Sequence, residues 1–190
     1  MRAKIAFLVL LLALTSCSTY RLVEPTRQDI AGHYSVATPI EWTGATVPNG
    51  EFWTINGGAL DELNFFAGIQ PGNSLVNAYG SDGEPPVFKA NMRASEVMEL
   101  VADSLAFQGY KKVRGSKLRP AKFGTLPGFR FEVVFTTEDG LNYAGKAIGT
   151  VADGELHLIL FSAPFSHYFP AYHQSVEQIF NSIDVAAESG

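Results

Sequence analysis

The segment 156–161 near the end of the chain is apolar at every position except His157. Because consecutive side chains of a strand point to opposite faces of a sheet, a strand of this composition needs an apolar layer on both of its faces. The segment therefore predicts a central strand in a sheet that is covered on both sides.

Two neighbouring segments supply antiparallel partners for this strand. Residues 129–135 place a bulky apolar side chain at every second position, which is the period of a half-buried strand. Asp139-Gly140 and Asp153-Gly154 are typical of tight hairpin turns, which favour residues that tolerate positive φ. The pattern predicts three antiparallel strands at about 129–136, 141–151 and 156–161.

Two stretches have the helical period instead. In the first, Ser95 is the expected N-cap and Gly109 lies just past the expected end. A second amphipathic helix is predicted at about 170–183. The two apolar stripes consist of Val97, Leu100, Val101 and Leu105 and of Tyr172, Val176, Ile179, Phe180 and Ile183. The predicted fold class is α+β, an antiparallel β-sheet flanked by helices in an α/β/α sandwich.

Strand patterns dominate the first half of the chain. Tyr34 and Val36 alternate with polar residues, and a tight hairpin is predicted from residues 52–55 through Asn56-Gly57-Gly58 to residues 59–69. In its second strand, Leu63, Phe65, Ala67 and Ile69 are expected on one face. Residues 70–86 contain several glycines and prolines and are expected to form a long irregular connection, either functional or mobile.

Composition limits the function classes. The chain has 190 residues, 46% of them hydrophobic, which suits one medium-sized globular domain. Its 19 acidic residues outnumber the 14 basic ones, so a general affinity for nucleic acid is disfavoured. The sequence contains no Gly-rich phosphate loop, no His-Glu-x-x-His and no Gly-x-Ser-x-Gly, and no cofactor is expected.

The first seventeen residues resemble a bacterial lipoprotein signal. Arg2 and Lys4 precede ten apolar residues, which at 1.5 Å per residue are too few to cross a hydrocarbon core of about 30 Å. The run ends in Leu14-Thr15-Ser16-Cys17, which resembles a lipobox. That motif implies cleavage before Cys17 and attachment there of a diacylglycerol and usually an acyl chain such as palmitate. The alternative is an ordinary cleaved signal peptide that leaves Cys17, the only cysteine, as an incidental thiol.

These features predict a signal peptide at 1–16, a lipidated N-terminus and tether at 17–30 and a single globular domain at 31–185. The tether is expected because Pro25 and several polar residues show neither a helical nor a strand period. Two or more acyl chains would anchor the domain durably to a membrane of the cell envelope. Because Ser18 and not aspartate follows Cys17, the outer membrane is preferred over the inner one, with the domain facing the periplasm.

The order of elements over residues 31–185 resembles the PsbP-like domains of the Mog, PsbP and DcrB type. The resemblance rests on Tyr34-Ser35-Val36 followed by Pro39 and Trp42, a mid-chain amphipathic helix, a run of long antiparallel strands and a closing helix that ends Ile179-Phe180-Asn181-Ser182-Ile183. It implies a helix, sheet and helix sandwich and a family without shared catalytic residues. Fold alone does not fix function.

Few residues suggest chemistry directly. Ser166-His167 could pair a nucleophile with a base, but sequence neighbours seldom reach that geometry and no positioned acid is near. Asp61 and Glu62 point to opposite faces of a strand and are poorly arranged as an acid and base pair. The four histidines, His33, His157, His167 and His173, form no cluster in the sequence, so no metal site is expected.

One charge pattern remains. Six cationic residues fall within twelve positions that contain no acid: Lys111, Lys112, Arg114, Lys117, Arg119 and Lys122. This basic strip is interpreted either as a binding face for an anionic partner, namely an envelope protein or lipid head groups, or as a solvated sheet edge whose lysines discourage strand addition. The second reading is the commoner one for charge runs.

Two function classes follow. The leading hypothesis is a membrane-anchored envelope lipoprotein that acts as a non-catalytic binding or assembly domain. The alternative is an envelope hydrolase whose site is assembled from residues distant in sequence, with the connection at 70–86 as a lid. A deep cleft that gathers His167, an acid and a serine would favour the enzyme, and a shallow aromatic or basic surface would favour binding.

Overall fold

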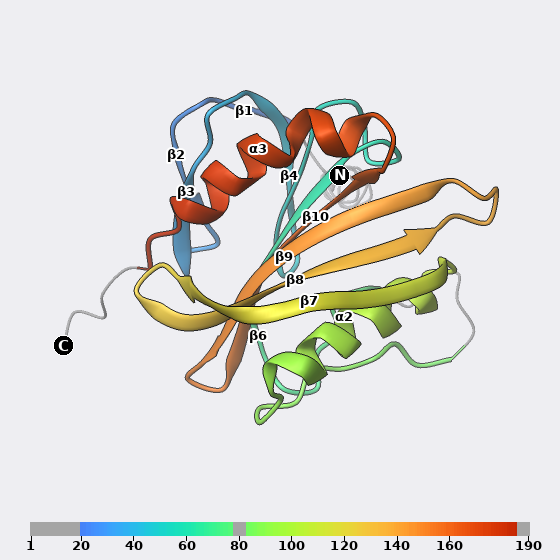
Figure 1. The fold of residues 1–190 in the computed structure, drawn as a ribbon. Coiled ribbons are helices and arrows are strands. Elements are labelled where there is room, and N and C mark those ends of the chain that lie inside the picture. Colours follow the sequence, from blue (N-terminus) through green and yellow to red (C-terminus); the bar gives the residue numbers. More distant parts are fainter. Residues whose placement is uncertain (1–19, 78–82, 186–190) are drawn as a thin grey trace, which may run out of the picture.

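A computed structural model describes residues 20–77 and 83–185 (Figure 1). The signal peptide predicted at 1–16 and Cys17 lie outside these residues. Within the described ranges the elements follow the order β1 (Arg21–Val23), β2 (Arg27–Ile30), β3 (Tyr34–Ala37), β4 (Trp42–Val47), β5 (Gly50–Thr54), β6 (Glu62–Ile69), α2 (Ala94–Phe107), β7 (Lys111–Phe123), β8 (Leu126–Thr136), β9 (Asn142–Ala152), β10 (Glu155–Pro164) and α3 (Tyr168–Asn181).

Eight of the described strands form one antiparallel main sheet in the order β1-β4-β5-β6-β10-β9-β8-β7, and β2 pairs with β3 separately. The segment that was predicted to be central lies in β10, between β6 and β9. Figure 1 shows α3 over one face of the main sheet and α2 over the other. The α+β class and the cover on both faces are therefore confirmed.

The sheet separates two apolar cores. The α3-side core includes Trp42, Trp53, Phe65, Phe161 and Ile179. The α2-side core is built by other residues, among them Phe88, Val97, Leu100, Phe131 and Leu158. Because β10 contributes to both cores, its apolar residues are buried on both faces, as the apolar run at 156–161 predicts.

A bulge between β6 and β10 changes which face β6 presents. The register shifts between the pairs Leu158↔Phe66 and Leu156↔Ile69, and Gly68 there has φ of 67°. A left-handed φ favours glycine, and a Cβ at this position would lie 2.4 Å from the His33 ring. Ile69 therefore packs in the α2-side core, whereas Leu63, Phe65 and Ala67 pack on the α3 side. The prediction that all four share one face was wrong for Ile69.

Helix ends and the first hairpin also differ in detail. Helix α2 has Arg93 and not Ser95 as N-cap, because the Arg93 backbone N–H donates to the Glu96 carboxylate at 2.7 Å. Gly109 follows the helix with φ of 96°, as expected of a residue past a C-cap. The β5–β6 connection runs from residue 55 to 61 and is closed by the Asp61 carboxylate, which accepts hydrogen bonds from the backbone of Ile55 and Asn56.

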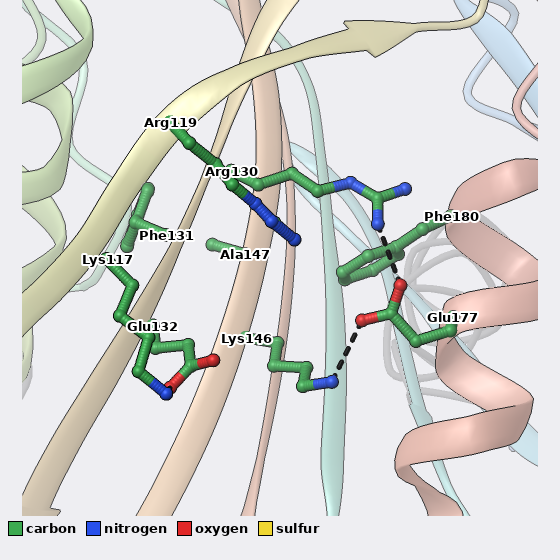
Figure 2. Close-up of a pocket in the computed structure, with 9 residues that line it drawn as sticks. All are labelled: Lys117, Arg119, Arg130, Phe131, Glu132, Lys146, Ala147, Glu177 and Phe180. Atoms are coloured by element: carbon green, nitrogen blue, oxygen red, sulfur yellow. Dashed lines mark hydrogen bonds and ion pairs between the residues drawn. The ribbon is translucent and has the colours of Figure 1, made fainter.

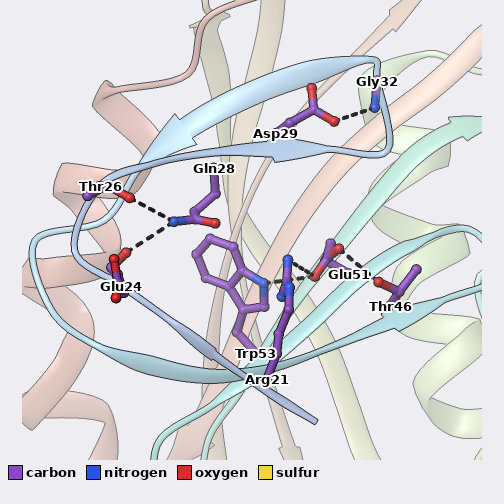
Figure 3. A network of polar contacts seen from close by, with 9 residues as sticks. All are labelled: Arg21, Glu24, Thr26, Gln28, Asp29, Gly32, Thr46, Glu51 and Trp53. Atoms are coloured by element: carbon purple, nitrogen blue, oxygen red, sulfur yellow. Dashed lines mark hydrogen bonds and ion pairs between the residues drawn. The ribbon is translucent and has the colours of Figure 1, made fainter. Parts of the chain in front are cut away.

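Residues 21–30 differ from the expectation of a tether, because they form β1 and β2. Val23 and Ile30 are buried, and the Arg21 guanidinium lies 3.0 Å from the buried Glu51 carboxylate. That carboxylate also accepts hydrogen bonds from Trp53 Nε1 and from the Thr46 hydroxyl (Figure 3). Strands of three and four residues are too short to show a period in the sequence, which is why they were missed.

Strand β3 meets the segment that follows α3. Ser35 in β3 and Asp184 exchange backbone hydrogen bonds of 2.8 and 2.9 Å, and the Ala37 N–H donates to the Ser182 hydroxyl at 2.7 Å. Of the connection predicted at 70–86, residues 78–82 lie outside the described ranges, and Ser74 bridges to Val87 across it. Among the described residues, no helix is both long and apolar enough to cross a membrane.

Candidate functional site

The basic strip lies on β7, which is an edge strand of the main sheet. Two irregularities interrupt its pairing with β8, and at them Lys112 and Lys117 each have φ of 53°. Bulges and lysines on an edge hinder strand addition by other chains. This part of the strip thus has the features of a protected edge.

The other part of the strip contributes to a pocket between the main sheet and α3. Figure 2 shows that its charged side chains come from β7, β8, β9 and α3. The cavity measures about 150 Å³, and four cationic side chains face two carboxylates in its lining. Its lining residues are Lys117, Arg119, Arg130, Phe131, Glu132, Lys146, Ala147, Glu177 and Phe180.

One carboxylate joins helix and sheet at the centre of this cationic pocket. Glu177 of α3 lies 2.7 Å from Arg130 Nη1 and 2.9 Å from Lys146 Nζ. The Arg130 guanidinium also donates to Asn181 Oδ1 at 2.9 Å and lies over the Phe180 ring, 5.4 Å from its centroid. Burial alone would raise the pKa of Glu177, but Lys146 and Arg130 outweigh it and lower that pKa. Glu177 is therefore ionised at neutral pH.

Charge in the pocket is not balanced. Lys117 pairs with Glu132 at 2.8 Å, whereas no described residue forms an ion pair with Arg119. Arg119 lies directly opposite Arg130 in the β7–β8 register. Like charges at facing positions repel, and a bound anion would relieve that repulsion. The arrangement is suited to an oxyanion such as a carboxylate or a phosphate.

The structure thus divides the basic strip. Lys117 and Arg119 line the pocket, and Lys122 lines an adjoining hollow with Arg130 and Phe180. The residues that line the pocket do not include Lys111, Lys112 and Arg114. Sequence reasoning missed Arg130, Lys146 and Glu177, because they lie on three other elements. The one available signal was that Arg130 alternates with the apolar residues of β8 and must point away from the α2-side core.

The fold brings His33 close to Glu155 and His157, which are distant from it in the sequence, and all three are of types that bind metals. Potential ligand atoms of His33, Glu155 and His157 lie within 4.8 Å of one another. However, the Gly68 backbone N–H donates to His157 Nδ1 at 3.1 Å, which places the proton of the neutral ring on Nε2. A metal-binding histidine normally has the opposite arrangement, with its second nitrogen donating to an acceptor. The hydrogen bonding in this cluster is therefore unfavourable for a metal.

The remaining sequence candidates have different surroundings. Ser166 and His167 are both exposed, and His167 is the N-cap residue of α3 with its ring against Tyr168. Asp61 serves the β5–β6 connection, while Glu62 lines a cavity on the α2 side. Burial is the largest cause of a raised pKa at Glu62.

No family model matches the chain, and no curated protein matches it. Among solved structures, it is similar to the solution structure of cyanobacterial PsbP (CyanoP) from Synechocystis sp. PCC 6803, with a TM-score of 0.53 and 12% identity over 91% of this chain and 96% of that chain. It also matches LpqN of Mycobacterium tuberculosis, described as involved in cell envelope biogenesis, with a TM-score of 0.38 and 11% identity over 92% and 88%. The comparison shows a PsbP-like fold, as the order of elements predicted. At these identities the likeness extends to the fold alone.

Proposed function

We propose that the protein is a membrane-anchored lipoprotein of the cell envelope that acts as a non-catalytic binding or assembly domain. It is anchored through acylated Cys17, preferably in the outer membrane and facing the periplasm. The observation that carries the binding role is the cationic pocket, in which Arg119 faces Arg130 but, unlike Arg130, has no carboxylate partner among the described residues. Its partner is a protein that presents an acidic side chain or chain end to this pocket.

The start of the described chain supports the anchor. Strand β1 begins four residues after Cys17, so its start lies at most about 14 Å from that residue. Tyr20 and Leu22 are each 61% exposed on this short segment. Large apolar and amphipathic side chains gain free energy at a membrane interface, so their position beside the lipid favours a domain that lies against the membrane.

The arrangement of the sheet favours a protein partner over the head groups of the anchoring membrane. Strands β1 and β7 are the two edges of the main sheet. With about 4.8 Å between neighbouring strands, these edges lie roughly 30 Å apart. With the β1 edge turned toward the membrane, the pocket at β7 lies on the far edge of the sheet, beyond a Debye length of about 8 Å from the lipid.

The anchor is tested by the variant Cys17→Ser. The hydroxyl is a far poorer nucleophile than a thiolate for thioether formation, so the variant should lose lipid attachment and maturation. Metabolic labelling with a clickable fatty-acid analogue, followed by gel analysis, measures this directly. Equal labelling of the variant and the parent protein would refute the lipoprotein assignment.

The pocket is tested by two charge reversals on the same strand. Arg119→Glu places a carboxylate in the cationic pocket, and Lys111→Glu makes the same change in charge outside it. Both positions are exposed, so neither variant should change the free energy of unfolding by more than about 0.5 kcal/mol. In cells treated with a cross-linker, Arg119→Glu should lose cross-linked species that Lys111→Glu retains. An identical cross-linking pattern for both variants would show that the pocket does not bind the partner.

A further inference from the structure

A second cavity, on the other face of the main sheet, is built differently from the cationic pocket. It measures about 200 Å³ and lies between α2 and the strands β6 and β10. Glu62 and Asn64 of β6 and Ser162 of β10 line it, with Glu62 and Ser162 directly paired across the two strands. Val101, Ser104, Leu105 and Gln108 contribute one face of α2, and Phe66 and Leu160 add apolar walls.

Ser104 is an unusual residue in this cavity. Its side chain is buried, with the residue 2% exposed, and its hydroxyl oxygen has no hydrogen-bond partner among the described residues. Leaving a buried hydroxyl unpaired is costly, and native proteins seldom do so without a ligand or a functional reason. The residue lines the cavity but its oxygen is covered, so this free hydrogen-bonding group reaches the cavity when the side chain rotates toward it.

Glu62 is the second unsatisfied group. Only a 3.4 Å hydrogen bond from Asn64 Nδ2 reaches its carboxylate, and no described Lys, Arg or His forms an ion pair with it. Burial is the largest cause that raises the pKa of Glu62, the Asn64 hydrogen bond lowers it, and the Asp61 carboxylate raises it further, with a raised pKa as the result. A partly buried carboxylate without a cation is an energetic cost that a cationic ligand would remove.

The surroundings of the cavity also favour positive charge. Gln108 is the C-cap of α2, so the cavity lies at the end of the helix where the dipole is negative. No basic residue occupies the last turn of α2 to offset this potential. Burial raises the pKa of Tyr110 and Tyr143, and the nearby Glu62 carboxylate raises it further. Neither tyrosine can supply a positive charge to Glu62.

We propose that this cavity binds a small organic cation, a primary ammonium group with a short apolar tail. The ammonium group donates hydrogen bonds to the Glu62 carboxylate and, with the Ser104 side chain rotated toward the cavity, to the Ser104 hydroxyl oxygen. The tail lies against Phe66, Leu105 and Leu160. A mixed cavity of this kind, apolar with a few convergent polar groups, is the usual form of a small-molecule site. The proposal is independent of the anchor and of the cationic pocket.

The test uses the full chain in neutral phosphatidylcholine nanodiscs with labelled Leu and Val methyl groups. Three probes of one shape differ in charge: n-butylammonium, 1-butanol and butyrate. Methyl shifts at Val101, Leu105 and Leu160 report binding, and empty nanodiscs correct for partition into lipid. Butylammonium should bind at least tenfold more tightly than butanol, as a charge-assisted hydrogen bond implies, and butyrate should bind least.

Three variants test whether Glu62 and the charge of the cavity cause the preference for butylammonium. Glu62→Gln should weaken butylammonium binding at least tenfold and leave butanol binding unchanged. Glu99→Gln, at an exposed site on α2 that does not line the cavity, should change neither. Gln108→Glu adds a carboxylate at the exposed rim and should strengthen butylammonium binding, which tests the charge preference even if Glu62→Gln folds poorly. Equal affinity for butanol and butylammonium, no effect of either charge change, or no methyl shift with any probe would overturn the proposal.

Discussion

At the scale of single residues, Glu177 has the largest structural role of the charged groups in the cationic pocket. It is the one carboxylate that joins α3 both to β8, through Arg130, and to β9, through Lys146. The two cations would repel each other without it. The carboxylate therefore fixes the position of the helix over the sheet while leaving Arg119 free to meet a partner.

The lowered pKa of Glu177 makes this role dependent on pH. Since the folded pKa lies below the ordinary value of 4.5, the carboxylate stabilises the fold above that value, and the contribution is lost as the pH falls toward the folded pKa. Glu177→Gln should therefore lower the free energy of unfolding by roughly 1 kcal/mol near neutral pH and by much less in acid. Urea unfolding of both proteins at about pH 7 and about pH 3.5 measures the difference.

Glu138→Gln is the matched control for this prediction, because Glu138 is exposed in the β8–β9 turn. It should leave the free energy of unfolding unchanged at both pH values. A cost of Glu177→Gln that stays constant between neutral and acid pH would show that packing, and not charge, accounts for it.

At the scale of elements, β10 is the strand on which both cores depend. Leu158 is fully buried on its α2 side. Leu158→Ala should lower the free energy of unfolding by about 2–5 kcal/mol, because it removes buried apolar surface and leaves a cavity. Denaturant unfolding with a two-state fit gives this value.

The control for Leu158→Ala is Val134→Ala on β8, where the side chain is 44% exposed. This change should cost less than about 1 kcal/mol. If Leu158→Ala also costs less than that, then β10 does not have the central position described above.

The elements that could be predicted from the sequence are those with a long, regular period. Alternation over 129–136 and the helical stripe from Val97 to Leu105 located β8 and α2, because their burial repeats over several turns or pleats. The tight turn expected at 56–58 proved to be a longer connection, since the Asp61 carboxylate satisfies its backbone N–H groups instead of a partner strand. Residues 21–30 were missed because the two strands there have only three and four residues, too few to show a period.

The candidate site could also be predicted from the sequence only in part. The charge run on β7 predicted Lys117 and Arg119 as possible anion ligands, but only the register places Arg130 opposite Arg119. The cavity at Glu62 could not be predicted from the sequence. Whether the Glu62 carboxylate has a cationic partner depends on which residues of α2 face it. Periodicity shows that a residue is on a buried face, but it does not show whether a buried polar atom finds a partner.

At the scale of the whole molecule, the main sheet keeps the two cores apart. Ile69 belongs to the α2-side core and Ile179 to the α3-side core. Ile69→Val and Ile179→Val should each cost about 0.5–1.5 kcal/mol, and because the sites share no partners their effects should add within about 0.5 kcal/mol in the double variant. Equilibrium unfolding of the four proteins gives the coupling energy. A coupling above about 1 kcal/mol would mean that the sheet transmits strain between the cores.

The meeting of β3 with residues 182–184 has a consequence for how the protein is made. The first part of the domain is closed by its last residues, and the β6–β10 contact joins positions 89 residues apart. At a synthesis rate of about 5–20 residues per second, the native pairing cannot be completed until nearly the whole chain has left the ribosome. A nascent chain of this topology stays unfolded for seconds, which is the condition that a translocation channel requires of its cargo.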